Sequence, residues 1–208
     1  MSGRAAVIVL AAGKGSRFPG PTHKLAQVLG GATVLGATLQ HAVASHLAVV
    51  VVTTEALADV ARRTVAARDV VVLPEVGSAG NAGLGMGHSI AAGVVARPDA
   101  RGWLILPGDM PLVQPASLQA VARELAQQAI VYAQHKGRRG HPVGFSAELY
   151  SELIALGGDE GARRLVARYP AFGVELDDPG VLVDVDTPAD LDALRRSGLP
   201  VITPVSRW

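Results

Sequence analysis

Glycines and cations follow the first apolar run of the chain, which covers residues 7–10. Gly13 and Gly15 permit backbone conformations that other residues avoid, and they let the main chain come close to a ligand. The cationic side chains beside them are Lys14, Arg17 and Lys24. Successive backbone N–H groups form an anion-binding concavity, and point charges neutralise phosphate oxygens. The residue types and their spacing therefore favour a nucleoside triphosphate site at this turn.

Two better-known phosphate loops differ from this sequence. A Walker loop needs Ser or Thr after Gly-Lys and a glycine before four spacer residues, whereas Gly15 follows Lys14 here. A dinucleotide fingerprint needs a third glycine where this chain has Phe18, and an acidic residue about 20 positions further on. The remaining alternative is an ordinary strand-to-helix turn whose basic side chains are solvated.

Acidic side chains follow later apolar runs. Asp109 comes after the run at residues 103–106 and directly after Gly108. Asp184 and Asp186 alternate near the C-terminal end, and alternation along a strand would place them on the same face. Carboxylate oxygens are the ligands that Mg²⁺ prefers. We therefore expect Asp109 and one of the two later aspartates to share a Mg²⁺ ion, while a turn aspartate bonding its own backbone is the alternative for Asp109.

Apolar β-branched runs alternate with alanine-rich stretches along most of the chain. We expect strands near residues 7–10, 47–52, 70–73, 103–106 and 130–133, and another that ends at residues 183–186. Helices are expected near residues 34–44, 56–67, 88–96 and 115–128, and a last one from Pro188. Such alternation produces right-handed crossovers and a mostly parallel sheet covered on both faces. The predicted fold class is α/β, doubly wound in three layers, with ligands at the carboxyl ends of the strands.

Bulk composition excludes several classes of protein. A chain of 208 residues suits one domain, which we expect to cover residues 1–208. The net charge of +1 argues against a general binder of nucleic acid or of a membrane surface. The absence of cysteine excludes disulfides, thiolate catalysis and cysteine zinc sites. No unbroken apolar run approaches the roughly 20 residues of a membrane helix, so we expect a cytoplasmic protein.

The glycine turn resembles the signature loop of the MobA-like nucleotidyltransferases. Its Ala-Ala-Gly spelling at residues 11–13 is similar to that of the molybdenum cofactor cytidylyltransferases (MocA-like) within that group. The resemblance implies a nucleotide-diphospho-sugar transferase fold of the GT-A, Rossmann-like type. It also implies that this loop holds the nucleotide through Leu10, Ala11, Ala12, Gly13, Lys14, Gly15, Ser16, Arg17 and Lys24.

Two further motifs occur in the family's order. The segment at residues 85–90 resembles the second nucleotide loop, which implies nucleotide contacts from Gly85, Met86 and Ser89. His88 stands where the family more often has a small hydroxyl residue, and we keep it outside the catalytic set as a helix cap, a solvated side chain or a substrate contact. Gly-Asp-Met-Pro at residues 108–111 resembles the metal motif, which adds Gly108 to the nucleotide site and supports the metal role of Asp109.

The segments beyond residue 134 resemble the acceptor side of the same family. The stretch at residues 135–145 is expected to be a basic hairpin or loop, which is either solvated or binds a phosphorylated second substrate, because arginine pairs with phosphate. Its Gly-His-Pro element implies acceptor contacts from His141 and Pro142. Asp159 belongs to a block that lies near the acceptor in the family, although a role as helix N-cap would also explain it. The block at residues 184–190 resembles the family's Asp-x-Asp-Thr-Pro-x-Asp terminus.

The resemblance implies a Mg²⁺-dependent transfer of a nucleoside monophosphate, CMP from CTP, onto a phosphorylated acceptor with release of pyrophosphate. The implied acceptor is molybdopterin or the molybdenum cofactor, and the catalytic residues are Arg17, Lys24 and Asp109. Expected partners are these small molecules and a molybdoenzyme or its accessory protein, with neither nucleic acid nor membrane. The alternatives are a sugar- or polyol-phosphate nucleotidyltransferase of the same fold, and a nucleotide-binding cofactor chaperone or regulator without turnover.

Overall fold

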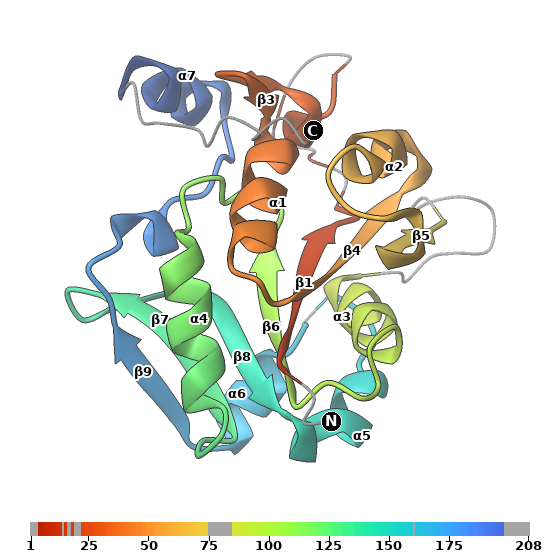
Figure 1. Cartoon of the computed structure of the whole chain (residues 1–208), viewed down its shortest axis with the longest axis vertical. Helices are drawn as coiled ribbons and strands as arrows, with labels where there is room; N and C mark the ends of the chain where they lie inside the picture. Colours follow the sequence, from red (N-terminus) through yellow and green to blue (C-terminus); the bar gives the residue numbers. More distant parts are fainter. Residues whose placement is uncertain are drawn as a thin grey trace.

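Seven strands in the described part of the chain form one sheet in the order β5-β4-β1-β6-β8-β7-β9 (Figure 1). The structure is a computed structural model, and it describes residues 4–13, 15, 18, 22–74, 85–159 and 161–197. The strands of the sheet are β1 (Ala6–Ala11), β4 (Ala48–Thr54), β5 (Val70–Leu73), β6 (Gly102–Pro107), β7 (Ile130–His135), β8 (Arg138–Ser146) and β9 (Ala171–Glu175). All neighbouring pairs are parallel except those that β8 makes with β6 and β7. The predicted α/β fold with a mostly parallel sheet is confirmed.

The helices follow the predicted alternation, with shifts at their ends. They are α1 (Val34–Ala44), α2 (Glu55–Arg62), α3 (Met86–Val95), α4 (Pro115–Glu124), α5 (Tyr150–Ile154), α6 (Arg163–Arg168) and α7 (Pro188–Ser197). The bounds of α1 are those predicted, whereas α2 and α4 end earlier. α2 stops before Thr64 and Val65, whose β-branched side chains lose rotamer freedom in a helix. Val65 packs against the apolar core instead.

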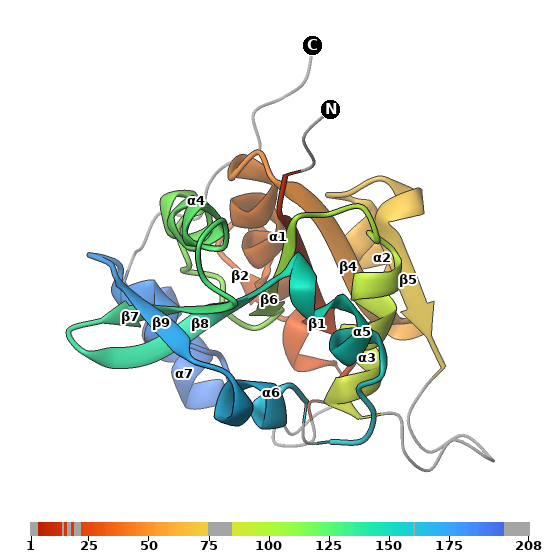
Figure 2. The ribbon, with the colours of Figure 1, turned by 90° about the horizontal axis from the view of Figure 1, so that it is seen from below.

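Alternate side chains of the central strands enter two separate apolar cores. Val7 and Val9 of β1 belong to one core, together with residues of α1 and α4. Ala6 and Ile8 belong to the other, together with residues of α3, α5 and α6. Apolar residues on both faces are what a strand covered on both sides requires. Figure 2 shows the resulting layers, with α1 and α4 on one side of the sheet and α3, α5 and α6 on the other.

A tight hairpin between β7 and β8 brings the basic stretch to the carboxyl end of β6. Lys136 and Gly137 both have a positive φ, 50° and 74°, which is the backbone that two-residue hairpin turns favour. Because β8 then runs antiparallel to β6, pairing Val143 with Ile105, its first residues lie at the end of β6 where Asp109 follows. Of a hairpin and a loop, the structure shows a β-hairpin for this stretch.

The expected strand at residues 183–186 is wrong. A short 3-10 helix, η4 (Pro179–Leu182), precedes these residues, and they pair with no strand among the described residues. The position beside β6 is filled by β8, so the segment crosses the carboxyl end of the sheet. The backbone N–H of Val185 donates to the carbonyl of Asp109 across 2.9 Å. The segment is thereby fixed beside the loop that follows β6.

Two further short strands, β2 (Val28–Leu29) and β3 (Ala32–Thr33), form a separate antiparallel pair before α1. The remaining short elements are the 3-10 helices η1 (Lys24–Ala26), η2 (Ala67–Asp69) and η3 (Ala147–Leu149). No helix in the described part of the chain is both long and apolar enough to cross a membrane.

Candidate active site

Lys24 lies between two carboxylates at the carboxyl end of the sheet. Its Nζ donates to Asp109 Oδ2 across 2.6 Å and to Asp186 Oδ1 across 2.9 Å. The Lys24 side chain is only 13% exposed. Burial lowers the pKa of Lys24, but the hydrogen bonds and charges of Asp109 and Asp186 outweigh it and raise the pKa above 10.5. Lys24 is therefore a fixed cation in this site at neutral pH.

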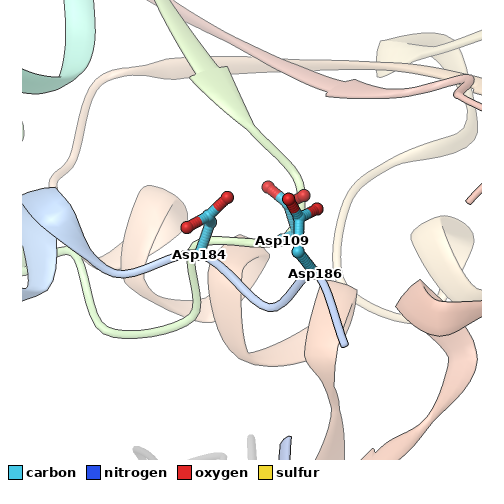
Figure 3. A group of neighbouring side chains, drawn as sticks. All are labelled: Asp109, Asp184 and Asp186. Carbon is cyan, nitrogen blue, oxygen red and sulfur yellow. The ribbon is translucent and has the colours of Figure 1, made fainter. Parts of the chain in front are cut away.

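Asp109, Asp184 and Asp186 converge as the sequence suggested. One oxygen of each lies within 4.8 Å of the others, so the three can face a common ion. Figure 3 shows that Asp109 comes from the loop after β6 and the other two from the segment before α7. Asp109 Oδ1 is buried and has no hydrogen-bond partner among the described residues. Lys24 contacts two of the three carboxylates, those of Asp109 and Asp186.

This cluster fits a divalent metal ion of the hard, oxygen-seeking type. The donors are all carboxylate oxygens, which Mg²⁺ and similar cations prefer. The buried Oδ1 of Asp109 carries acceptor capacity that a cation would satisfy. The three carboxylates converge although the predicted strand is absent, because contacts with neighbouring segments, rather than a sheet, fix residues 184–186.

The start of α7 fixes the backbone of Asp186. Thr187 and Asp190 form a reciprocal cap: Asp190 N donates to Thr187 Oγ1, and Asp190 Oδ2 accepts from the N–H of Thr187 across 2.7 Å. The same Oδ2 accepts from the N–H of Asp186 across 3.1 Å. Thr187 is therefore the residue whose side chain caps α7. Asp190 thus orients the residue that holds Lys24.

His23 connects the glycine turn to Lys24, a contact that the sequence did not suggest. Its Nδ1 accepts from the N–H of Leu25 across 3.1 Å, so in the neutral ring Nε2 carries the proton and donates to the carbonyl of Gly13 across 2.9 Å. Gly15 has the positive φ, +59°, that was expected of the turn, whereas Gly13 is not among the residues with positive φ. The predicted ligands Lys14, Ser16 and Arg17 lie outside the described residues.

The second predicted nucleotide loop is joined to the loop after α5. The N–H of Gly87 donates to the carbonyl of Gly158, and the N–H of Gly158 donates to His88 Nδ1 across 3.3 Å. A side chain at Gly85 would collide with Asp159, because the two lie in contact. His88 therefore holds a neighbouring loop rather than standing free in solvent. Residues 75–84 of this region lie outside the described residues.

Asp159 is not a helix N-cap. α6 begins at Arg163, its cap position is Ala162, and no side chain caps it. The glycines on either side of Asp159, Gly158 and Gly161, have positive φ values, so the chain turns here before a helix can start. Asp159 instead lines the cleft beside Gly85.

Basic residues line the far wall of the cleft. Arg138, Arg139 and His141 come from β8, and Arg163 comes from α6. The guanidinium of Arg139 lies 4.4 Å from the centre of the Tyr132 ring, which supports its orientation. Burial lowers the pKa of His141 below 6.5 in spite of the opposing charges of Asp109 and Asp184, so its imidazole is neutral at pH 7.

Most of the predicted site residues line one cleft of about 1280 Å³. This volume exceeds the 300–1,000 Å³ usual for one small ligand, so two substrates have room side by side. The lining includes Leu10, Ala12, Gly13, Gly15, Lys24, Gly85, Met86, Ser89, Asp109, His141, Asp159, Asp184 and Asp186. Ala11, Gly108 and Pro142 are buried and are not among the lining residues. The backbone N–H of Gly108 donates to the carbonyl of Leu10, so Gly108 supports a lining residue without lining the cleft itself.

Comparison with known families places this cleft in context. The family model described as a MobA-like NTP transferase domain matches residues 7–172. The chain belongs to this family. The match contains the glycine turn, Lys24 and Asp109, and it ends before Asp184 and Asp186.

Relatives of this MobA-like chain include curated proteins and solved structures. The purine catabolism protein PucB of Bacillus subtilis (strain 168) is 36% identical over 118 residues, which are 54% of this chain and 57% of PucB. The chain thus spans little more than half the length of that relative. The crystal structure of Rv0371c from Mycobacterium tuberculosis H37Rv is 29% identical, with a TM-score of 0.79, and the match covers 94% of this chain and 99% of that one. A second crystal structure of Rv0371c, a complex with manganese, matches with a TM-score of 0.75 and 29% identity over 93% of this chain and 99% of that one.

Proposed function

We propose that this MobA-like protein is a metal-dependent nucleotidyltransferase that moves a nucleoside monophosphate from a triphosphate to a phosphorylated acceptor. The observation that carries the proposal is the convergence of Lys24 with Asp109, Asp184 and Asp186 in one cleft. These residues come from three segments that are far apart in sequence. A cation and a set of acids so close together suit a polyphosphate held through a divalent ion.

The three aspartates are the residues that would hold the metal ion, and we propose Mg²⁺ for that place. Support comes from the all-oxygen donor set, from the buried Oδ1 of Asp109, and from the manganese complex of the relative Rv0371c. A divalent cation supplies Lewis-acid polarisation of phosphate oxygens when bound.

The chain's own groups account for positioning and for charge. In the proposed reaction an acceptor phosphate oxygen bonds to the α-phosphorus while the bond from the α-phosphorus to the pyrophosphate oxygen breaks. Lys24 would offset the charge that develops on the α-phosphoryl group and the departing pyrophosphate, and Arg17 would join it from the glycine turn. Backbone amides at residues 12–16 would hold the phosphates. No side-chain nucleophile is needed, because the two reactants combine directly once they are aligned.

The nucleotide's base and ribose would lie between the glycine turn and the start of α3. Leu10, Ala12 and Ser89 line this end of the cleft. Gly85 and Met86, at the start of α3, line the cleft beside them. We propose CTP as the donor because the Ala-Ala-Gly spelling at residues 11–13 is similar to that of the cytidylyltransferases.

The acceptor would lie against the basic wall. Arg138, Arg139 and Arg163 can pair with its phosphate, and the neutral imidazole of His141 lies beside Asp109 and Asp184. Asp159, which lines the cleft beside Gly85, is a further proposed contact of the acceptor. We propose molybdopterin or the molybdenum cofactor as the acceptor, with a molybdoenzyme or its accessory protein as the recipient of the product, in the cytoplasm. We propose that residues 1–208 form a single domain, which would bind both the triphosphate and the acceptor.

A panel of substrates tests the proposed function. CTP, GTP, UTP and ATP are each mixed with molybdopterin, with a sugar phosphate or with a polyol phosphate, and pyrophosphate release is measured with and without Mg²⁺. The expected result is Mg²⁺-dependent release with CTP and molybdopterin. Pyrophosphate release with a sugar or polyol phosphate instead would identify that compound as the acceptor in place of molybdopterin. Nucleotide binding by calorimetry without release for any acceptor would instead indicate a regulator or chaperone.

A further inference from the structure

A buried carboxylate outside the cleft lies where the two acid-bearing segments meet. Asp178 is 3% exposed and is not among the residues that line the cleft. Its Oδ2 accepts from the N–H of Gln114 across 2.9 Å and from Ser117 Oγ across 2.6 Å. Its Oδ1 accepts from the N–H of Gly180 across 2.9 Å. A buried carboxylate that accepts three hydrogen bonds is held firmly, because an unmade bond would be costly there.

The partners of Asp178 belong to the two segments that carry the metal-site acids. Gln114 and Ser117 start α4, directly after the loop that begins at Asp109. Gly180 belongs to η4, which leads to the segment of Asp184 and Asp186. Position 180 requires glycine, because a Cβ there would lie 2.3 Å from the carbonyl oxygen of Leu112. The two segments are therefore in backbone contact next to Asp178.

The same two segments are joined a second time beside the cleft. There the N–H of Val185 donates to the carbonyl of Asp109 across 2.9 Å. The joined region thus has hydrogen bonds at two ends, Asp178 at one and Val185 at the other, and the segment also packs through the fully buried side chains of Val181 and Val185. Without the bonds of Asp178, the segment from residue 179 to residue 186 would be held less closely against the loop of Asp109, and the carboxylates would shift. Metal affinity responds to such shifts, because ligand distances must stay within about 0.2 Å of their preferred values.

We propose that Asp178 is a positioning residue that holds the segment of Asp184 and Asp186 against the loop of Asp109, so that the three carboxylates meet at one point. The proposal rests on the metal role assigned above to those three residues. Asp178 touches neither substrate nor metal in this arrangement. Its effect is transmitted through the backbone of η4 and through the start of α4.

The test is the affinity of the whole protein for Mn²⁺ alone, measured by isothermal titration calorimetry at 25 °C with folding checked by circular dichroism. Asp178→Asn turns one oxygen into an N–H donor that faces other donors, and we expect Mn²⁺ affinity to fall by about 10- to 100-fold, as for other residues behind a metal ligand. Ser117→Ala keeps the carboxylate and removes one of its bonds, and we expect a smaller fall. Asp69→Asn is the matched control, because Asp69 is a partly buried carboxylate paired with Arg97 outside this cleft; we expect wild-type affinity.

Each outcome decides the proposal. A weaker Mn²⁺ affinity in folded Asp178→Asn and in Ser117→Ala, but not in Asp69→Asn, supports it. If folded Asp178→Asn binds Mn²⁺ with wild-type affinity, the role of Asp178 is overturned and the metal site stays in place. If Asp178→Asn does not fold, wild-type affinity in Ser117→Ala leads to the same conclusion. If the wild-type protein does not bind Mn²⁺, or if Asp109→Asn binds it as tightly as the wild type does, the metal site itself fails. The role of Asp178 then fails with it.

Discussion

Lys24 and Asp109 are 85 positions apart in the chain, yet Lys24 Nζ lies 2.6 Å from Asp109 Oδ2. Lys24 begins η1 after the glycine turn, and Asp109 follows β6, which pairs with β1 in parallel. Parallel neighbours end at the same edge of a sheet, so the residues that follow them meet. The site is thus a direct consequence of the order of strands.

Replacing Asp109 by Asn tests its proposed part in the metal site. The change keeps the shape of the side chain and removes the charge that faces Lys24 and the two later aspartates. We expect loss of Mg²⁺-dependent pyrophosphate release, with the circular dichroism spectrum unchanged. Asp59→Asn, on the exposed side of α2, is the control and should keep full activity. Near-normal Mg²⁺-dependent turnover in Asp109→Asn would remove the metal assignment.

Lys24→Ala tests the proposed action on developing charge. The loss of one preorganised donor costs on the order of 10²-fold in rate or more, and we expect kcat to fall by that amount. Lys136→Ala is a suitable control, because Lys136 lies at the exposed β7–β8 turn and does not line the cleft. A Lys24→Ala enzyme with unchanged kcat and a raised KM would show that the ammonium group serves binding only.

The strands and the positions of the motifs could be predicted because each depends on local sequence. Apolar β-branched runs mark β1, β4 and β6, and the residues just after them carry the chemistry. The convergence of Asp109 with Asp184 and Asp186 was predicted from the rule that ligands gather at strand ends, but that rule holds only for Asp109, because the two later aspartates do not lie on a strand. The expected bounds of α1 match for the same local reason, since Thr33 caps it and Ser45 ends it.

Other features could not be predicted because they depend on contacts between distant segments. β8 carries several polar residues and β9 is only five residues long, so no long apolar run marks either strand. The segment of Asp184 resembles a strand in sequence, but β8 already fills the place beside β6. Nothing in the local sequence shows that His23 bonds Gly13 or that Asp178 bonds the start of α4. Such roles appear only when the backbone is in place.

The two hydrogen bonds of His23 can be separated by substitution. Asn at position 23 can still cap η1 by accepting from the N–H of Leu25, but it is too short to keep the bond to Gly13, and Ala loses both bonds. We expect both variants to raise the KM for the triphosphate by up to about 10-fold, since one hydrogen bond contributes about 0.5–1.5 kcal/mol and about 1.4 kcal/mol is a factor of ten. Only His23→Ala should also lower the melting temperature. Equal KM values in wild type and His23→Asn would show that the Gly13 contact is dispensable.

Ala12→Gly tests whether the methyl group at position 12 selects the base. Ala12 lines the cleft at the end of β1, where a larger side chain than glycine leaves less room for a purine. We expect the ratio of kcat/KM for CTP to that for GTP to fall in the variant, by a factor consistent with the 10- to 200-fold that one methylene can supply. The measurement is pyrophosphate release with the two triphosphates in competition. Unchanged selectivity would count against a role for this position.

The capping carboxylate of Asp190 predicts how acid affects the start of α7. The hydroxyl and then the backbone N–H of Thr187 hold the pKa of Asp190 below its ordinary value of 3.8. A carboxyl whose pKa is lower in the folded state stabilises that state when ionised, so its contribution is fully present above the unfolded pKa and is lost as the pH falls through the folded pKa. Asp190→Ala should therefore lower the free energy of unfolding by a constant amount from pH 7 to about pH 5, and the difference from wild type should shrink below about pH 4. Urea unfolding across this range measures it, with Asp192→Ala on the same helix as the control. A gap that stays constant into acid would mean that Asp190 acts through packing rather than through its charge.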